Sequence, residues 1–437
     1  MQETHKTFKY FQALATSQPS SLGSEFENKV NALSNQERRT LFADILNADQ
    51  ITDQLKAITE AAPRLLDGVP YLLQDMFDVA GQSTRCGAPL SETLDEPVDE
   101  SCLLYRHLNA LGACYLGKTQ TSEFGMEPSG ANLTHGKCTH PNGPDLITGG
   151  GASAASVAVK TGYAPLAFGL DTYGGVRIPA AFLGLFAYRM ESNRFAESGV
   201  FPIAPSIESV GFFTNNLEDL KTTFLALYGY TDFQDENPVN GCFVSDISGA
   251  VNVEIKSGLV KLCRVLSAHE DLSVTTKLTN SFRNAKTTLD IILSRELYSI
   301  HRYWIEEYED QYDPHLVQFI DNGMNCSPSA TESANENQRS VRSAIAEVFI
   351  DYDYIILPIS TEANLLTEDW SQEIEDDIIH LIAPVSLAFI PAIILPINCG
   401  EGRTSAVQVL INPEKLKLVP SIIAKAARYY ANGIRDN

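Results

Sequence analysis

The chain has 437 residues, 44% hydrophobic and 20% charged, which is the composition of a globular protein long enough to bury a large core. Its formal net charge of −23 disfavours binding to nucleic acid or anionic lipid, and no stretch approaches the roughly 20 apolar residues of a membrane helix. The N-terminal residues lack the basic and then apolar pattern of a signal peptide, so we expect a cytoplasmic location.

The first 60 residues predict helices, because polar residues 34–36 lead into apolar residues at helical spacing across 38–58. Residues 69–73 predict a buried strand that ends at Gln74 and Asp75. Residues 102–117 predict a helix that leads into a strand. Helices and strands that alternate in this way are typical of an α/β fold.

The centre of the chain is rich in glycine and alanine. It predicts a helix over residues 153–162, a strand over 164–171 and a helix that begins at a proline over 178–189. Residues 275–313 predict a long helical stretch whose aromatic side chains belong to the core, and the polar residues 322–337 predict a loop.

Three apolar runs near the end of the chain, residues 352–359, 390–397 and 405–411, predict strands that are buried on both faces. Residues 418–434 predict an amphipathic helix. The chain contains no repeat and no linker, so we expect one large domain over residues 1–437, with residues 1–60 as a helical segment packed on it.

Six segments in a fixed order carry the strongest functional signal. They are GVPYLLQDMFDVAGQSTRCGAPL at 68–90, LGACYLGKTQTSEFGM at 111–126, TGGGASAAS at 148–156, GLDTYGGVRIPAAFLGL at 169–185, DYIILP at 353–358 and IPAIILPIN at 390–398. Together they resemble the amidase-signature family, which includes a component of the tRNA-dependent amidotransferases. The resemblance implies the fold of that family, a large mixed twisted β-sheet covered by helices on both faces.

The resemblance also implies a reaction centre. Members of the family hydrolyse or transfer amide and ester groups with a nucleophilic serine, a bridging serine and a lysine base. The matching positions here are Val176 for the nucleophile, Gly151 for the bridging serine and Gln74 for the lysine. Gln74 offers a carboxamide, Gly151 only a hydrogen atom and Val176 an isopropyl group. None of these groups can act as a base or attack a carbonyl carbon. In the glycine-rich run Ser153 is the alternative to position 151, although the distance to Gly162 favours Gly151.

The turn before Val176 implies a surviving oxyanion-like site, because backbone N–H groups near Tyr173, Gly174 and Gly175 need no side chain. Tyr173 stands where the family usually has glycine, so its ring either narrows the pocket or adds a contact. Thr172 lies in the same turn. We expect Asp75, Asp171 and Arg177 to support the framework, as the matching residues of the family do.

Other residues offer replacement chemistry, and each has a structural interpretation. A turn threonine such as Thr172 mostly bonds locally, and Cys86 is expected to be a buried, inert thiol. Asp75 and Asp78 form a candidate acid–base pair, but the resemblance gives the first a structural role. The run Gly149-Gly150-Gly151 lacks the spacing of a phosphate-binding loop.

The eight cysteines include no CxxC pair, so reduced and mostly buried thiols are expected. His135, Cys138 and His140 lie close together, but three ligands without a distant fourth fit a zinc site poorly. We expect a polar loop there, no metal and no cofactor.

The sequence therefore predicts a catalytically inactive amidase homologue that binds a small amide- or carboxylate-bearing ligand, a protein partner or a second copy of itself. Two alternatives stay open. One is an amide or ester hydrolase or amidotransferase that acts through residues outside the family pattern. The other is a purely structural protein with a collapsed pocket.

Overall fold

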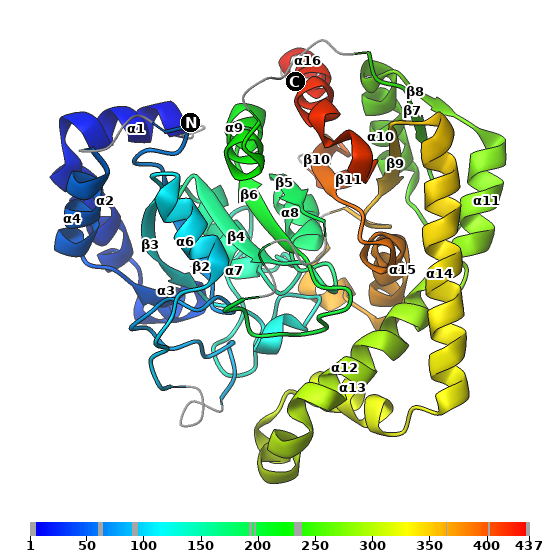
Figure 1. Cartoon of the computed structure of the whole chain (residues 1–437), viewed down its shortest axis with the longest axis horizontal. Coiled ribbons are helices and arrows are strands. Elements are labelled where there is room, and N and C mark those ends of the chain that lie inside the picture. Colours follow the sequence, from blue (N-terminus) through cyan, green and yellow to red (C-terminus); the bar gives the residue numbers. More distant parts are fainter. Residues whose placement is uncertain are drawn as a thin grey trace.

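The computed structural model describes residues 6–59, 64–89, 95–191, 195, 198–230, 238–363, 365–400 and 403–433. The predicted segments 1–60, 68–90 and 418–434 each extend beyond these ranges, at residues 1–5, Leu90 and Ile434. Figure 1 shows a central sheet with helices packed around it.

The core is an 11-stranded mixed sheet in the order β1-β3-β2-β4-β6-β5-β10-β11-β9-β7-β8. Strand β2 pairs in parallel with β3 and β4, whereas β10 pairs antiparallel with β5 and β11. The strands are β1 Phe42–Ile45, β2 Pro70–Gln74, β3 Cys114–Thr119, β4 Leu166–Leu170, β5 Phe186–Arg189, β6 Val210–Thr214, β7 Gly241–Phe243, β8 Ala268–Glu270, β9 Tyr354–Pro358, β10 Ala392–Asn398 and β11 Thr404–Ile411.

Helices cover both faces of this sheet, which confirms the predicted α/β architecture (Figure 1). They are α1 Phe8–Ser17, α2 Pro19–Asn31, α3 Asn35–Leu41, α4 Ala48–Thr59, α6 Leu103–Ala110, α7 Ser153–Lys160, α8 Arg177–Leu183, α9 Leu217–Tyr228, α10 Val253–Leu266, α11 Leu272–Phe282, α12 Ala285–Tyr308, α13 Pro314–Met324, α14 Pro328–Asp351, α15 Gln372–Ala388 and α16 Val419–Gly433.

The predicted loop over residues 322–337 is wrong, because most of it lies in α13 and α14. Helix α14 has Pro328 in its first turn, and the Ser327 side chain caps it by accepting a hydrogen bond from the Ala330 amide at 3.1 Å. Over this polar half of the helix only Ala334 is buried, so the segment is an exposed helix face that resembles a loop in its composition.

Two other predicted helices contain strands. The segment 178–189 divides at Gly184, whose φ of +63° ends α8, and β5 then pairs with β6 and β10. The segment 38–58 contains β1, because Phe42 packs its ring against Phe26 and Tyr163 and begins a strand that pairs with β3. The long stretch 275–313 is helical as predicted and is interrupted between α11 and α12.

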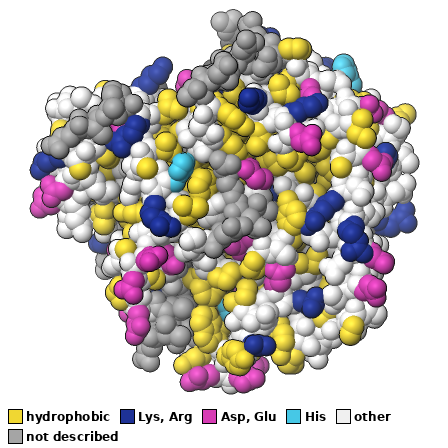
Figure 2. Space-filling model, in the orientation of Figure 1, with side chains coloured by type: hydrophobic (Ala, Val, Ile, Leu, Met, Phe, Trp, Pro, Cys, Tyr) yellow, Lys and Arg dark blue, Asp and Glu magenta, His cyan; other side chains and the backbone are white. Residues whose placement is uncertain are grey.

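On the face of the molecule shown in Figure 2, acidic and basic side chains are interspersed with apolar ones. The excess negative charge of the chain therefore forms no single continuous patch on that face.

Candidate functional site

The structure brings Gln74, Gly151 and Val176 together, the three positions that the sequence analysis matched to the reaction centre of the family. Gln74 ends β2, Gly151 precedes α7, and Val176 caps the N-terminus of α8. A Cβ atom on Gly169 of β4 would lie 3.0 Å from Gln74 Oε1 and 3.6 Å from Val176 Cγ2. The backbone of Gly151 lies next to the turn before Val176, because its nitrogen would be 3.7 Å from a Cβ atom on Gly175. The order of motifs therefore predicted a real spatial cluster.

Gln74 is fully buried, and both ends of its carboxamide are hydrogen-bonded. Its Nε2 donates to Thr121 Oγ1 at 2.7 Å, and its Oε1 accepts from the Leu170 amide at 2.7 Å. Thr121 Oγ1 in turn donates to the Gly151 carbonyl at 3.0 Å. Through Thr121, the Gln74 side chain thus connects β2, β4 and the glycine-rich loop.

Residue 151 has no room for a side chain. A Cβ atom there would lie 2.8 Å from both the Cα and the carbonyl carbon of Gly125, and closer still to its carbonyl oxygen. Backbone atoms cannot rotate away as the end of a side chain can. A serine at position 151 therefore requires the segment around Gly125 to move.

The segment that fills this space is held by aromatic packing. Phe124, next to Gly125, is buried with a φ of +47°, a conformation that costs energy for a residue with a Cβ. Its ring stacks on Tyr312 at 5.8 Å and meets the edge of His301 at 4.6 Å. Glu123 accepts a hydrogen bond from the Asp313 amide at 3.0 Å, and burial raises the pKa of Glu123 to about 7.

Val176 is also fully buried. A Cβ atom on Gly211 of β6 would lie 3.0 Å from Val176 Cγ1, so the isopropyl group packs directly against that strand. The amide of Val176 donates to Asp171 Oδ2 at 3.2 Å. Val176 is therefore part of the apolar core.

The turn at 172–175 is packed, not open. The Tyr173 ring meets Phe319 of α13 edge-on at 5.7 Å, and its hydroxyl donates to Asp290 of α12 at 3.0 Å. Burial, together with Asp290, raises the pKa of Tyr173 well above its usual value. The tyrosine fills the space and joins the turn to two helices.

Thr172 is 2% exposed, and its hydroxyl has no hydrogen-bond partner within the described part of the chain. The expectation of a local hydrogen bond for this turn threonine is therefore wrong. The Thr172 carbonyl accepts a hydrogen bond from Ser386 Oγ at 3.0 Å. Ser153, the alternative to position 151, is buried and donates to the Gly130 carbonyl at 3.4 Å.

A buried charge cluster supports the turn. Arg177 Nη2 lies 2.8 Å from Asp171 Oδ1, and Arg189 Nε lies 3.4 Å from the same oxygen. Burial alone would raise the pKa of Asp171, but the two guanidinium groups outweigh it and hold that pKa below the usual value. Burial and the neighbouring Arg177 lower the pKa of Arg189 to about 9. The sequence reasoning missed Arg189, which it placed in a helix.

A second cluster follows β2. Lys118 Nζ lies 3.2 Å from Asp75 Oδ1 and donates to Thr84 Oγ1 at 2.8 Å, and Thr84 Oγ1 donates to Asp78 at 2.7 Å. Burial raises the pKa of Asp75 to about 6, although Lys118 opposes this. The side-chain contacts of the two aspartates differ, since Asp75 pairs with Lys118 and Asp78 accepts from Thr84. Lys118 belongs to the Gly-Lys-Thr motif, but the motif alone did not indicate this role.

The thiols and imidazoles fit structural roles. Cys86 is buried as expected, and burial raises the pKa of its thiol well above the usual value. Cys138 donates to the Thr40 carbonyl, and His140 Nε2 lies 3.3 Å from the Phe182 carbonyl. Within the described ranges no three His, Cys, Asp or Glu residues are placed to hold a metal ion.

A mixed sheet with helices on both faces and this order of buried motifs define an amidase-type α/β protein. The family model for amidases matches residues 26–292, more than half of the chain, so the chain belongs to the amidase family. One relative is the A component of the glutamyl-tRNA(Gln) amidotransferase of Akkermansia muciniphila. It is 32% identical over 234 residues, which cover 51% of this chain and 49% of that protein.

Two further relatives are similar. Outer envelope protein 64, chloroplastic, of Arabidopsis thaliana is 26% identical over 323 residues, 68% of this chain and 55% of that protein. The AtzE component of the 1-carboxybiuret hydrolase of Pseudomonas is 30% identical over 216 residues, 49% of this chain and 45% of that protein. The chain thus spans about half the length of the curated relatives it matches.

Solved structures share the fold. One chain of an inhibitor-bound vestigial protein complex, described with the origins of an s-triazine catabolic enzyme, superposes with a TM-score of 0.85 at 20% identity over 98% of each chain. A crystal structure of an amidase superposes with a TM-score of 0.82 at 21% identity over 97% of this chain and 100% of that one. The predicted amidase-signature fold is confirmed. Across the described residues, no helix is long and apolar enough to cross a membrane.

Proposed function

We propose that this chain is a catalytically inactive amidase homologue, one amidase-like domain that acts by binding a partner or ligand. The observation that carries the proposal is the filled centre: Gln74 and Val176 have no exposed surface, and a side chain at Gly151 would overlap the backbone of Gly125. Such a centre holds neither a substrate nor a group that attacks it.

The names of two relatives support a role inside an assembly, since the amidotransferase relative and AtzE are both called subunits. An accessory chain would keep the amidase fold as a scaffold for a protein partner or a second copy while losing the chemistry. The expected cytoplasmic location belongs to the same proposal.

The test is a reversion. The triple variant Gln74→Lys, Gly151→Ser and Val176→Ser restores the three side chains of the family pattern. We expect that neither the natural protein nor the triple variant hydrolyses small amides or esters above the uncatalysed rate, whereas an active amidase assayed in parallel does. Turnover by the natural protein would refute the proposal that it is inactive. Turnover gained only by the variant would show that the centre has room for a substrate and is not filled.

One observation favours a second candidate, an amide or ester hydrolase with a different nucleophile. The buried Thr172 hydroxyl lacks a hydrogen-bond partner in the described ranges and lies four residues before Val176. If that hydroxyl were the nucleophile, Thr172→Val would abolish turnover while Thr172→Ser would retain it.

A further inference from the structure

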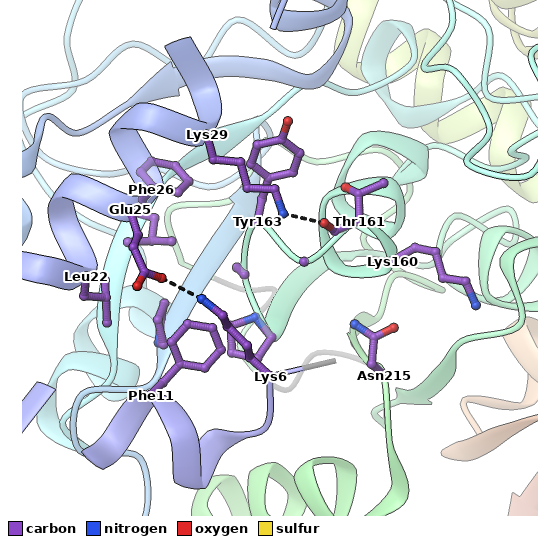
Figure 3. A pocket seen from close by; sticks show the side chains of 15 residues that line it. Lys6, Phe11, Leu22, Glu25, Phe26, Lys29, Lys160, Thr161, Tyr163 and Asn215 are labelled. Atoms are coloured by element: carbon purple, nitrogen blue, oxygen red, sulfur yellow. Dashed lines mark hydrogen bonds and ion pairs between the residues drawn. The ribbon is translucent and has the colours of Figure 1, made fainter. Parts of the chain in front are cut away.

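Helix α2 and helix α13 are attached to the rest of the fold through different side chains. A cavity of about 510 Å³ lies between α1, α2 and the turn from α7 to β4, and Lys29 of α2 reaches that turn by donating to the Thr161 carbonyl at 2.6 Å (Figure 3). Helix α13 is attached through His315 in its first turn. Histidine is the side chain whose charge ordinarily changes between about pH 5 and 8, so this second attachment can respond to pH.

The His315 ring lies between two carboxylates from other parts of the chain. Its Nδ1 lies 3.4 Å from Oε2 of Glu127, which follows the segment 111–126, and its Nε2 lies 3.5 Å from Oε1 of Glu375 in α15. The three side chains are 22%, 18% and 7% exposed, so water and salt screen these ion pairs only in part. Three segments that are distant in the sequence thus meet at one imidazole.

Both carboxylates are fixed by further hydrogen bonds. Glu127 Oε1 accepts from the Ser129 hydroxyl at 2.6 Å and from the Ser129 amide at 3.1 Å, and Glu375 Oε2 accepts from the Trp370 indole at 3.3 Å. The other oxygen of Glu375, Oε1, is buried and accepts no hydrogen bond within the described part of the chain. The ring of His315 is therefore placed to compensate a buried charge.

The number of protons on the ring decides whether both contacts are favourable. Only the protonated imidazole carries an N–H group on each nitrogen, so only this form can direct a donor at each carboxylate. The neutral ring leaves a nitrogen lone pair facing a carboxylate oxygen. Burial alone would lower the pKa of His315, but the carboxylates of Glu375, Glu127 and Asp313 outweigh it and raise that pKa above its usual 6.5.

Other ionisable groups around α13 have partners of their own. Glu123 accepts a hydrogen bond from the Asp313 amide at 3.0 Å, and burial raises the pKa of Glu123 to about 7. His301 Nδ1 of α12 lies 3.0 Å from the Tyr312 hydroxyl, and burial lowers the pKa of His301 to about 4, so this ring is neutral near pH 7. Charges elsewhere on α12 and α15 pair with one another, Lys286 with Asp290 at 2.6 Å and with Asp376 at 3.1 Å.

Helix α13 also packs on the turn before Val176. The His315 ring meets the Phe319 ring edge-on at 5.2 Å, and the Phe319 ring meets Tyr173 edge-on at 5.7 Å. Phe319 thus lies between the histidine and the turn at 172–175. A change at His315 is therefore transmitted to the packing of that turn through one side chain.

We propose that His315 makes a pH-sensitive contact, which holds α13 on Glu127 and Glu375 while the imidazole is protonated and lets the helix loosen when the proton is lost. The contribution of this contact to stability is fully present below about pH 6.5 and is lost as the pH rises through the raised pKa of the folded protein. The inference goes beyond the proposed function, because it concerns the mobility of α13 and holds whether or not the centre is inactive.

The test is amide hydrogen exchange of the full chain, read by mass spectrometry from about pH 6.5 to about pH 8.5 and corrected for the intrinsic rate at each pH. We expect the protection of peptides from α13 to fall by roughly fivefold or more across this range. Constant protection of α13 in the natural protein would overturn the proposal.

Two histidine variants assign the effect. His315→Gln keeps a donor but cannot take up a proton, so protection of α13 should be low already at about pH 6.5 and change less than about twofold. His269→Gln, on the exposed part of β8, is the matched control and should behave like the natural protein. Glu123 is present in all three proteins, so the difference between them belongs to His315. A fall in His315→Gln as large as in the natural protein would refute the contact.

A carboxylate variant keeps the test decisive even if His315→Gln does not fold. Glu375→Gln retains an acceptor for the Trp370 indole but removes one negative charge beside the imidazole. The pH at which α13 loses half of its protection should therefore move to a lower value. A midpoint at the same pH as in the natural protein would show that the Glu375 carboxylate does not hold the proton on His315, and the proposal would be wrong.

Discussion

The carbonyl group of Gly125 occupies the place that a side chain on Gly151 would need. This relationship joins two motifs that lie far apart in the sequence, the segment at 111–126 and the glycine-rich loop at 148–156. A serine at position 151 therefore does not fit in this backbone unless the segment around Gly125 moves.

The close approach predicts a stability effect. Gly151→Ala should lower the free energy of unfolding by about 1–3 kcal/mol, because its Cβ overlaps backbone atoms that cannot rotate away. Urea denaturation measures the change. The matched control is Gly143→Ala, where the new Cβ would meet only Leu146 side-chain atoms at 3.6 Å or more, and it should stay within about 0.5 kcal/mol of the natural protein. A neutral Gly151→Ala would contradict the packing described here.

Gln74 should be required for stability. Gln74→Leu removes the acceptor of the Leu170 amide and the donor to Thr121, which leaves buried polar groups without partners. We expect a loss of about 1–3 kcal/mol in the free energy of unfolding. The exposed Gln311→Leu serves as the control and should have little effect. If Gln74→Leu were as stable as this control, the bridging role of the carboxamide would be wrong.

The raised pKa of Glu208 predicts that the free energy of unfolding depends on pH. It is 2% exposed, its Oε2 accepts from the Ile203 amide at 2.7 Å, and burial raises its pKa from a usual 4.5 to about 7. Between these two values the folded state binds more protons than the unfolded state. Stability therefore falls as the pH rises from about 4.5 to 7 and levels off above that.

The variant Glu208→Gln keeps an acceptor for Ile203 but cannot ionise, so it should remove part of this slope, on the order of 3 kcal/mol between the two limits. Unfolding free energies measured from about pH 4.5 to 8 test this, with the exposed Glu100→Gln as the control. A slope in Glu208→Gln as steep as in the natural protein would show that Glu208 ionises normally.

The cysteines predict a simple labelling pattern. Seven of the eight are buried, and Cys326 is the partly exposed one. A thiol reagent such as Ellman's reagent should therefore react quickly with about one thiol in the folded protein and with all eight after denaturation. Cys326→Ser should abolish the fast reaction. A fast reaction that survives in this variant and maps to Cys86 would show that the Cys86 thiol is reactive and would support it as a replacement nucleophile.

The sequence predicted the fold well where local patterns decide it. The buried runs that become β2, β4, β9, β10 and β11 are short, apolar and bounded by polar residues or turns. It failed where tertiary contacts decide. The four residues of β5 resemble the end of a helix because their strand character comes from pairing with β6 and β10.

The site was predictable in position but not in shape. The spacing of motifs located Gln74, Gly151 and Val176, and the structure places them side by side. The sequence could not show that Tyr173 reaches Asp290, 117 positions away, or that Gly125 fills the space at Gly151. Both contacts depend on how distant segments meet, which residue patterns do not encode. Arg189 was missed for the same reason.

Labelling with a fluorophosphonate, which modifies activated serine and threonine hydroxyls, decides whether the filled centre is inert. After incubation of the folded protein with an excess of reagent, mass spectrometry should detect no adduct, while an active amidase in the same tube should be fully modified. An adduct on Thr172, Ser153 or any other side chain around the buried turn at 172–176 would show the opposite, because it would reveal a reactive hydroxyl that solvent and substrate can reach.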